Sequence, residues 1–378
     1  MPLRVTLTWR RLVIGGLASA LAGIAAAGLV AASGVYNVAA SRGHPFFVRQ
    51  FLELGMRRSV KTHGDAPKAP DLTDPNLITL GASHFQNSCA TCHGSPTQPR
   101  TPVSAAMLPA PPPLADKVSN WSDHELHWIV LHGLKYTGMP GWAGSGRDDE
   151  VWAVVAFLRK LPDIDEKHYR TLASGQMAPA DAHPDATAPA DAAVCAQCHG
   201  TATAPPTSIY VPRLAGQNAK YLENALHDYR HGLRESGIME PVAAELPEED
   251  LKKIARYFAD LESPPFPTDP SVEAERISRG QRLALEGDGH RLASCASCHI
   301  ASTRPDYPRL AGQSEVYLRT QLVLLKKGER SQTPAGKLMA DIARDLSDQQ
   351  AQDIAAFFAS LPPPNAKRED IDTSGSAE

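Results

Sequence analysis

Three copies of one short motif contain every cysteine of this chain. They read Cys89-Ala90-Thr91-Cys92-His93, Cys195-Ala196-Gln197-Cys198-His199 and Cys295-Ala296-Ser297-Cys298-His299. Two thiols separated by two residues lie on one helical turn, where both can form thioethers with the vinyl groups of one porphyrin. The histidine that follows places an imidazole under the iron as its proximal ligand. The spacing therefore predicts three covalently bound haem c groups, with three proximal ligands: His93, His199 and His299.

Two other uses of such cysteines agree less well with the sequence. A zinc site would combine two motifs to obtain four ligands, and three motifs do not pair evenly. A redox-active dithiol needs no adjacent histidine and belongs to a βαβ pattern, which this sequence does not show. Six cysteines in 378 residues are also too few for a disulfide scaffold. Haem attachment is the interpretation that uses all three motifs.

Each haem iron needs a sixth ligand, and the chain has seven methionines. Each unit has one methionine that is best placed for this role: Met139, Met239 and Met339. Met239 and Met339 each lie 40 residues beyond the histidine of their own motif, and Met139 lies 46 residues beyond its own. A soft thioether favours ferrous iron and closes the sixth position to substrates. This ligand set predicts electron transfer, with no catalytic residue required.

The second nitrogen of a proximal imidazole usually donates to a backbone carbonyl. Pro212-Arg213-Leu214 and Pro308-Arg309-Leu310 follow their motifs at a suitable distance, and Pro112-Pro113-Leu114 is the counterpart in the first unit. The first proline carbonyl of each segment is the expected acceptor. Three further histidines share one predicted helix and are interpreted as packing or surface residues rather than ligands: His124, His127 and His132.

Three repeated units must position these motifs. The sequence divides into a membrane anchor at 1–41, a juxtamembrane amphipathic segment at 42–69, units at 70–170, 194–263 and 271–361, an Ala- and Pro-rich linker at 171–193, and a disordered tail at 362–378. Apolar residues at i, i+3, i+4 and i+7 close the second and third units, which predicts helices and an all-α fold. The long linker should let the first unit move, whereas the short Pro264–Pro270 connection should pack the other two face to face.

The N-terminus is typical of a segment that enters a membrane. Arg4, Arg10 and Arg11 precede an uncharged run of 27 residues, Leu12–Val38. A spanning helix needs roughly 20 apolar residues, so the run favours an uncleaved transmembrane helix. A signal peptide cleaved before Ser41 is the alternative.

The segment after the anchor and the overall charge carry further information. His44–Val60 holds Phe46, Phe47 and Phe51 among arginines, which suits a helix at the lipid headgroups or an ordinary surface helix packed on the first unit. The net charge of −4, without a basic patch, argues against a nucleic-acid partner.

The second and third units resemble the dihaem cytochrome c-four family over residues 194–361. The resemblance rests on the haem motifs, on the repeated Pro-Arg-Leu-Ala-Gly-Gln and Tyr-Leu segments, and on Gly232 and Arg234 with Gly328 and Arg330. It implies two cytochrome c domains that carry electrons in the periplasm to terminal oxidases. Met239 and Met339 stand where that family has its axial methionines. One departure is that little sequence before Cys195 could form the usual first helix.

The first unit resembles membrane-anchored, single-haem bacterial cytochromes c through its Thr137-Gly138-Met139-Pro140 loop. Together the resemblances imply three tandem cytochrome c domains after an N-terminal transmembrane helix, on the periplasmic side of the bacterial inner membrane. The expected partners are membrane lipid and redox proteins: a terminal oxidase, a quinol-oxidising complex or a dehydrogenase. The alternatives are a cytochrome c subunit of a membrane-bound dehydrogenase and, less favoured, a haem peroxidase, which would need a displaceable sixth ligand.

Overall fold

The described chain is built from α-helices. The computed structural model describes residues 8–65, 67–144, 146–173, 188–189, 191–263, 274–289, 292–300 and 304–365. Within these ranges no β-strand occurs, and the isolated bridge between Ser95 and Gln98 is not part of a sheet. The predicted all-α fold is confirmed.

The first unit places its haem motif between two helices that pack on each other. Its elements are α3 (Pro75–His84), η1 (Phe85–Cys89), α4 (Ala90–His93), α5 (Pro102–Ala105), η2 (Val118–Asn120), α6 (Asp123–His132), α7 (Asp148–Lys160), η3 (Leu161–Asp163) and α8 (Glu166–Ala173). A capping box opens α6: the Glu125 amide donates to Ser122 Oγ at 3.2 Å, and the Ser122 amide donates to Glu125 Oε2 at 2.7 Å. Phe85, Phe157 and Tyr169 fill the core of this unit.

The second and third units repeat this arrangement. The second contains α9 (Ala192–His199), α10 (Ala219–Arg230), α11 (Met239–Glu245) and α12 (Glu248–Asp260). The third contains α13 (Ala274–Glu286), α14 (Ala296–His299), α15 (Glu315–Lys327), α16 (Pro334–Arg344) and α17 (Asp348–Ser360). The apolar residues that predicted the two closing helices are buried in the cores, among them Leu251, Ile254 and Phe258 in α12 and Ile354 and Phe358 in α17.

In the first and third units, a glycine marks the point where the first helix crosses the long helix on which it packs. A Cβ at Gly81 of α3 would lie 1.9 Å from the carbonyl oxygen of Ala153 in α7, and one at Gly280 of α13 would lie 1.9 Å from that of Asp353 in α17. Most of the segment directly before α9 lies outside the described residues, so the expected departure of the second unit stays a prediction.

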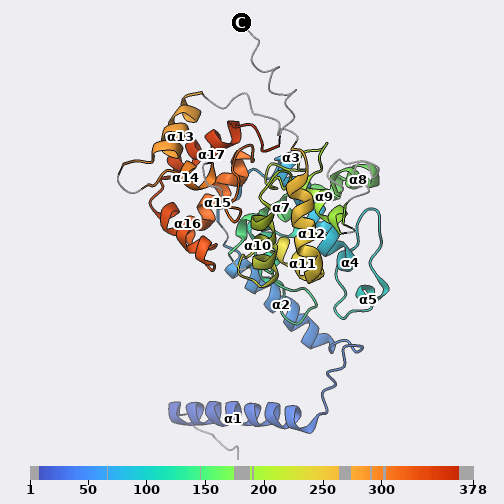
Figure 1. Cartoon of the computed structure of the whole chain (residues 1–378). Coiled ribbons are helices and arrows are strands. Elements are labelled where there is room, and N and C mark those ends of the chain that lie inside the picture. The colour runs from blue at the N-terminus through green and yellow to red at the C-terminus, as the bar shows by residue number, and fades with distance from the viewer. Residues whose placement is uncertain are drawn as a thin grey trace, which may run out of the picture.

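The second and third units lie side by side (Figure 1), and reciprocal hydrogen bonds relate their repeated segments by a local two-fold. The Arg213 amide donates to Gln313 Oε1 at 2.9 Å, and Gln313 Nε2 donates back to the Arg213 carbonyl at 2.8 Å. The Arg309 amide and carbonyl make the same exchange with Gln217, at 2.7 and 2.9 Å. The repeated Pro-Arg-Leu-Ala-Gly-Gln segments thus build the interface, as the prediction of face-to-face packing required.

The first residues of the predicted tail lie against this interface. A Cβ at Gly312 would lie 2.6 Å from Pro363 Cα, and one at Gly216 would lie 2.6 Å from the Pro364 carbonyl oxygen. Residues 362–365 are therefore packed, in contrast to the prediction of a disordered tail from 362. The rest of that tail, 366–378, and the connection Pro264–Pro270 lie outside the described residues.

The first unit packs against the second, so the prediction that it moves freely is wrong. Tyr210 Oη donates to Asp74 Oδ2 at 3.0 Å, and Ser208 Oγ donates to the Asn76 carbonyl at 2.9 Å. The prediction relied on the composition of the linker at 171–193, most of which lies outside the described residues. Composition does not reveal the complementary faces that two units present to each other.

Two helices precede the first unit. α1 (Trp9–Ser33) has 25 residues, none of them buried, and is long and apolar enough to cross a membrane; a signal sequence would meet the same criteria. It ends at Ser33, five residues before Val38, and its C-cap is Gly34, whose φ of 67° is left-handed. Figure 1 shows α1 apart from the helical units and joined to them through α2.

The two halves of α2 (Phe46–His63) have different surroundings. Near its C-terminus, Val60 is fully buried and the ring of His63 stacks on Trp128 of α6 at 6.2 Å. Near its N-terminus, three phenylalanines are exposed: Phe46 by 70 %, Phe47 by 73 % and Phe51 by 74 %. The interpretation of a helix packed on the first unit is confirmed for the C-terminal half, whereas the N-terminal half keeps these three phenylalanines exposed.

Candidate functional site

The histidine of each motif is oriented by a proline carbonyl, as predicted. The distance from Nδ1 to the carbonyl oxygen is 2.9 Å for His93 and Pro112, 2.7 Å for His199 and Pro212, and 2.9 Å for His299 and Pro308. With the Nδ1 proton donated to the carbonyl, Nε2 carries the lone pair that can bind a metal. The same orientation recurs in three units although the number of residues between histidine and proline differs.

Burial keeps these imidazoles neutral. It lowers the pKa of His93, His199 and His299, and the hydrogen bond to the proline carbonyl only partly opposes this effect. A neutral imidazole is the form that coordinates iron. The three histidines therefore have both the orientation and the protonation state of a proximal ligand.

The cysteines have the surroundings of attachment points rather than of a reactive dithiol. All six are free thiols. Burial raises the pKa of Cys89 and of Cys195 to about 12, and that of Cys198 to about 11. A redox-active cysteine needs the opposite, a lowered pKa. Among the described residues, no three His, Cys, Asp or Glu side chains cluster in a way that could hold a metal ion, so the motifs do not combine into a zinc site.

The third motif opens onto a cavity. The cavity has a volume of about 200 Å³ and is lined by Cys298, His299, Tyr307 and Arg309, with Asn218 from the second unit. Cys298 is the one exposed thiol of the six. A pair of thiols, a neutral imidazole with a free Nε2, and space beside them are what a covalently attached haem requires, so the residues fit this group.

The three candidate distal methionines occupy one position of the repeat. They stand at 139, 239 and 339, and the closing helices α7, α12 and α17 begin at 148, 248 and 348. Met239 opens α11, where its amide donates to Ser236 Oγ at 3.0 Å. Met339 lies in α16 against the core of the third unit. This constant interval supports the choice of Met139, whose distance from its motif differs from the other two; their ligation stays a prediction.

A second methionine lies beside the Met139 loop. A Cβ at Gly138 would lie 1.9 Å from Cε of Met107. The loop itself is held by two hydrogen bonds, from the Met139 amide to Thr137 Oγ1 at 3.1 Å and from the Leu134 amide to the Met139 carbonyl at 3.2 Å. Met139 remains the proposed ligand because it alone shares the repeated position.

The three histidines of α6 pack on tryptophans, as predicted. His127 is 1 % exposed, its ring lies 4.3 Å from Trp152, and its Nε2 lies 3.2 Å from the Asp148 carbonyl. His124 meets the edge of the same indole at 5.7 Å. His132 lies 5.0 Å from Trp128.

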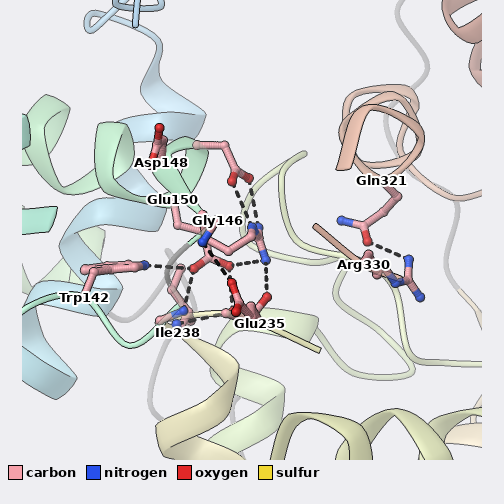
Figure 2. Close-up of polar contacts among 12 residues, drawn as sticks. Trp142, Gly146, Asp148, Glu150, Glu235, Ile238, Gln321 and Arg330 are labelled. Atoms are coloured by element: carbon pink, nitrogen blue, oxygen red, sulfur yellow. Dashed lines mark hydrogen bonds and ion pairs between the residues drawn. The ribbon is translucent and has the colours of Figure 1, made fainter. Parts of the chain in front are cut away.

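Sequence reasoning missed a buried carboxylate between the first and second units. Glu150, at the start of α7, is 7 % exposed and accepts hydrogen bonds from Trp142 Nε1 at 3.2 Å, Ser236 Oγ at 2.6 Å and the Gly237 amide at 2.8 Å. It also forms an ion pair with Arg147 at 2.7 Å. Figure 2 shows the carboxylate between these donors.

One signal in the sequence could have revealed this contact. The repeats of the second and third units agree at Arg234 and Arg330, but Ser236 and Gly237 stand where the third unit has Gln332 and Thr333. A small residue pair in the unit that contacts the first unit permits close approach. The packing inside either unit does not explain why Ser236 and Gly237 replace Gln332 and Thr333.

Comparisons with known proteins match most of the haem-bearing part of the chain. Residues 76–158 and 185–258 match the family described as "Cytochrome C oxidase, cbb3-type, subunit III", and residues 277–362 match the family "Cytochrome c". The thiosulfate dehydrogenase electron acceptor of Stutzerimonas stutzeri strain A1501 is 37 % identical over 174 residues, which are 45 % of this chain and 80 % of that protein.

Two cytochromes c4 are also similar. That of Pseudomonas aeruginosa is 34 % identical over 178 residues, which cover 46 % of this chain and 86 % of that protein. The solved structure of the Acidithiobacillus ferrooxidans cytochrome c4 is 30 % identical in sequence, with a TM-score of 0.40, and covers 44 % of this chain and 98 % of that one.

Proposed function

Because the chain belongs to the cytochrome c family, we propose that it is a membrane-anchored electron carrier with three covalently bound haem c groups. The observation that carries this proposal is the proximal geometry: in each unit an imidazole held by a proline carbonyl follows two free thiols. Bound haem iron supplies a one-electron ferric/ferrous couple. The relatives are electron carriers or electron acceptors, so an electron-transfer role is favoured over catalysis.

The residues that would hold the groups follow from the repeat. The thioether bonds would involve Cys89 and Cys92, Cys195 and Cys198, and Cys295 and Cys298. The axial pairs would be His93 with Met139, His199 with Met239, and His299 with Met339. Thioether ligation raises the reduction potential and leaves no open position for a substrate.

The proposed location is the periplasmic side of a bacterial inner membrane, with α1 as the anchor. α1 is fully exposed and has the length of a spanning helix. The exposed phenylalanines of α2 follow it closely and suit the lipid headgroup layer. A periplasm-active reporter fused after Glu378 should be active, and activity of a cytoplasmic reporter alone would contradict this orientation.

A terminal oxidase is the acceptor that we propose first. The first and second units match the subunit III family of cbb3-type oxidases, and cytochrome c4 relatives match about half of the chain. The second candidate is an electron acceptor for a dehydrogenase. Similarity to two thiosulfate dehydrogenase electron acceptors favours it, at 37 % and 33 % identity.

A haem count tests the first half of the proposal. Acid-acetone extraction of the mature full-length protein should leave the haem on the polypeptide, and a pyridine haemochrome assay should give three haems per chain. Two or fewer would contradict it, and turnover of hydrogen peroxide with a reduced cytochrome would indicate a peroxidase instead.

Rapid mixing tests the partners. The reduced protein should be oxidised by a cbb3-type oxidase in detergent. The oxidised protein should be reduced by thiosulfate dehydrogenase with thiosulfate only if the second candidate is right. Ascorbate reduction is the control that shows the sites to be competent in both experiments.

A further inference from the structure

The contact between the first and second units is made by the segments that carry two of the proposed distal methionines. We call residues 137–144 and 234–239 the distal loops, because they contain Met139 and Met239. The indole of Trp142 in the first loop faces Ser236 and Gly237 in the second. This contact lies outside the proximal geometry and outside the two-fold interface of the second and third units.

The distal loops approach so closely that each has a glycine at the contact. A Cβ at Gly237 would lie 2.1 Å from Trp142 Nε1, and one at Gly144 would lie 2.9 Å from the Ser236 amide nitrogen. Both distances are shorter than a side-chain carbon can adopt. The loops are therefore fitted to each other.

Glu150 is the common acceptor between the two loops. Its two carboxylate oxygens face four donors, from Arg147, Trp142, Ser236 and the Gly237 amide. An ionised carboxylate is an acceptor only, so it satisfies all four. A glutamine of the same size would turn an NH₂ group towards donors. Burial raises the pKa of Glu150, and the charge of Arg147 opposes this rise.

The hydrogen bonds continue from Glu150 to both methionine segments. Ser236 Oγ donates to Glu150 and accepts from the Met239 amide at 3.0 Å, which holds the first turn of α11. On the other side, the Trp142 amide donates to the Leu131 carbonyl at 2.8 Å, which ties the first loop to α6. Arg147 also reaches across the interface, where it donates to the Glu235 carbonyl at 3.1 Å.

We propose that Glu150 is a positioning residue that fixes the two distal loops against each other, so that the first and second redox sites operate as one rigid pair. The proposal rests on the proposed function, since it takes Met139 and Met239 as distal ligands. The third unit has no counterpart, because Gln350 at the corresponding helix position caps its own Ser347. The chain would therefore contain two fixed contacts between units. The Arg–Gln exchange joins the second and third units, and Glu150 joins the first and second.

Amide hydrogen exchange of the full-length holoprotein tests the proposal, with Glu150→Gln as the main variant. Loss of the shared acceptor should speed exchange of the Gly237 amide and of the Met239 amide by about tenfold or more. In Gly237→Ala the added methyl group should push the two loops apart while the charge of Glu150 stays. This variant should also speed exchange of the amides at 237 and 239. Asp353→Asn is the matched control, because Asp353 is a buried carboxylate that bonds Arg279 within the third unit.

A redox titration supplies the second readout. Removal of a buried negative charge disfavours the ferric state, so Glu150→Gln should raise the potentials of the first and second sites and leave the third unchanged. Asp353→Asn should leave the reduction potentials of the first and second sites unchanged. Faster exchange confined to the first unit in Glu150→Gln and Gly237→Ala, with 234–239 unchanged, would overturn the proposal. Absence of methionine–iron bands in the unmodified protein would instead refute the assignment of Met139 and Met239 as ligands. The exchange result would still show whether Glu150 fixes the two distal loops against each other.

Discussion

At the scale of single residues, one hydrogen bond decides the chemistry of each site. A proline carbonyl takes the Nδ1 proton of His93, His199 and His299, at 2.7 to 2.9 Å. The bond fixes the ring and leaves Nε2 for a metal, while burial keeps the ring neutral. Raised thiol pKa values complete the picture, since buried, protonated cysteines are not poised for redox exchange.

Replacing a distal methionine should affect one site at a time. Met239→Ala and Met339→Ala should each remove one methionine–iron charge-transfer band and lower one potential, because the thioether favours ferrous iron. Absorption spectra and a redox titration measure both effects. Met56→Ala, in the half-buried part of α2, is the control and should change neither. If Met139→Ala leaves all three bands intact, Met107 beside Gly138 becomes the candidate in the first unit.

At the scale of helices, the first and third units depend on a close crossing. α3 crosses α7 at Gly81, and α13 crosses α17 at Gly280. A Cβ added to either glycine would lie 1.9 Å from a backbone carbonyl oxygen of the other helix. Buried closing helices supply the apolar faces on which the rest of each unit packs. The crossing needs a glycine because no side chain fits between the two backbones.

Gly280→Ala should destabilise the third unit. The added methyl group would meet the Asp353 carbonyl and force α13 away from α17, at a cost of about 1–3 kcal/mol. Urea unfolding followed by circular dichroism measures the loss. Gly55→Ala in α2 is the matched control: a Cβ there meets nothing within 4 Å, so alanine should be neutral or slightly stabilising. Equal effects of the two variants would contradict the crossing argument.

Asp353 joins the same two helices and should give a pH-dependent contribution. Burial acts to raise its pKa, but hydrogen bonds from Arg279 and Gln349 outweigh it and lower the pKa below the usual range. The stabilisation is therefore complete above the unfolded pKa of about 3.9 and is lost as the pH falls through the lower folded pKa.

Asp353→Asn tests this contribution. The variant should lose about 1–3 kcal/mol of unfolding free energy at neutral pH, because Arg279 loses the negative charge and one of the two acceptor oxygens at position 353. Its difference from the unmodified protein should shrink as the pH drops below about 4. If the difference in unfolding free energy between the two proteins stays constant from about pH 3 to about pH 7, the charge of Asp353 is not involved.

At the scale of the whole molecule, the three units form one connected body. The Arg–Gln exchange joins the second and third units, and Glu150 with Tyr210 joins the first to the second. Residues 362–365 close over the two-fold interface. Of the part of the chain that the structure describes, α1 with the N-terminal half of α2 extends from this body (Figure 1).

Cleavage of the linker should not release the first unit. A protease site inserted in the 171–193 segment would separate the chain into a one-haem and a two-haem fragment. The contacts of Glu150 and Tyr210 should hold the fragments together, so that they co-elute on size-exclusion chromatography in detergent. Elution of the two-haem fragment by itself would contradict a rigid assembly. A site inserted in the exposed stretch 39–43 is the control, because its cleavage should remove the anchor alone.

Local features were readable from the sequence. Covalent spacing within Cys-x-x-Cys-His determines the attachment chemistry, and helical periodicity determines the closing helices, because both depend on neighbouring residues. The repeat also indicated the two-fold interface, and the two copies of Pro-Arg-Leu-Ala-Gly-Gln do bond to each other in a symmetric exchange.

Only the tertiary structure decided how the first unit is attached. Glu150 and Ser236 lie 86 residues apart, and neither residue carries a motif. The composition of the linker between them suggested freedom, whereas the faces on either side fit each other through Gly144 and Gly237. The two complementary faces combine residues that lie far apart in the sequence, so the contact between the first two units appears only when the chain is folded.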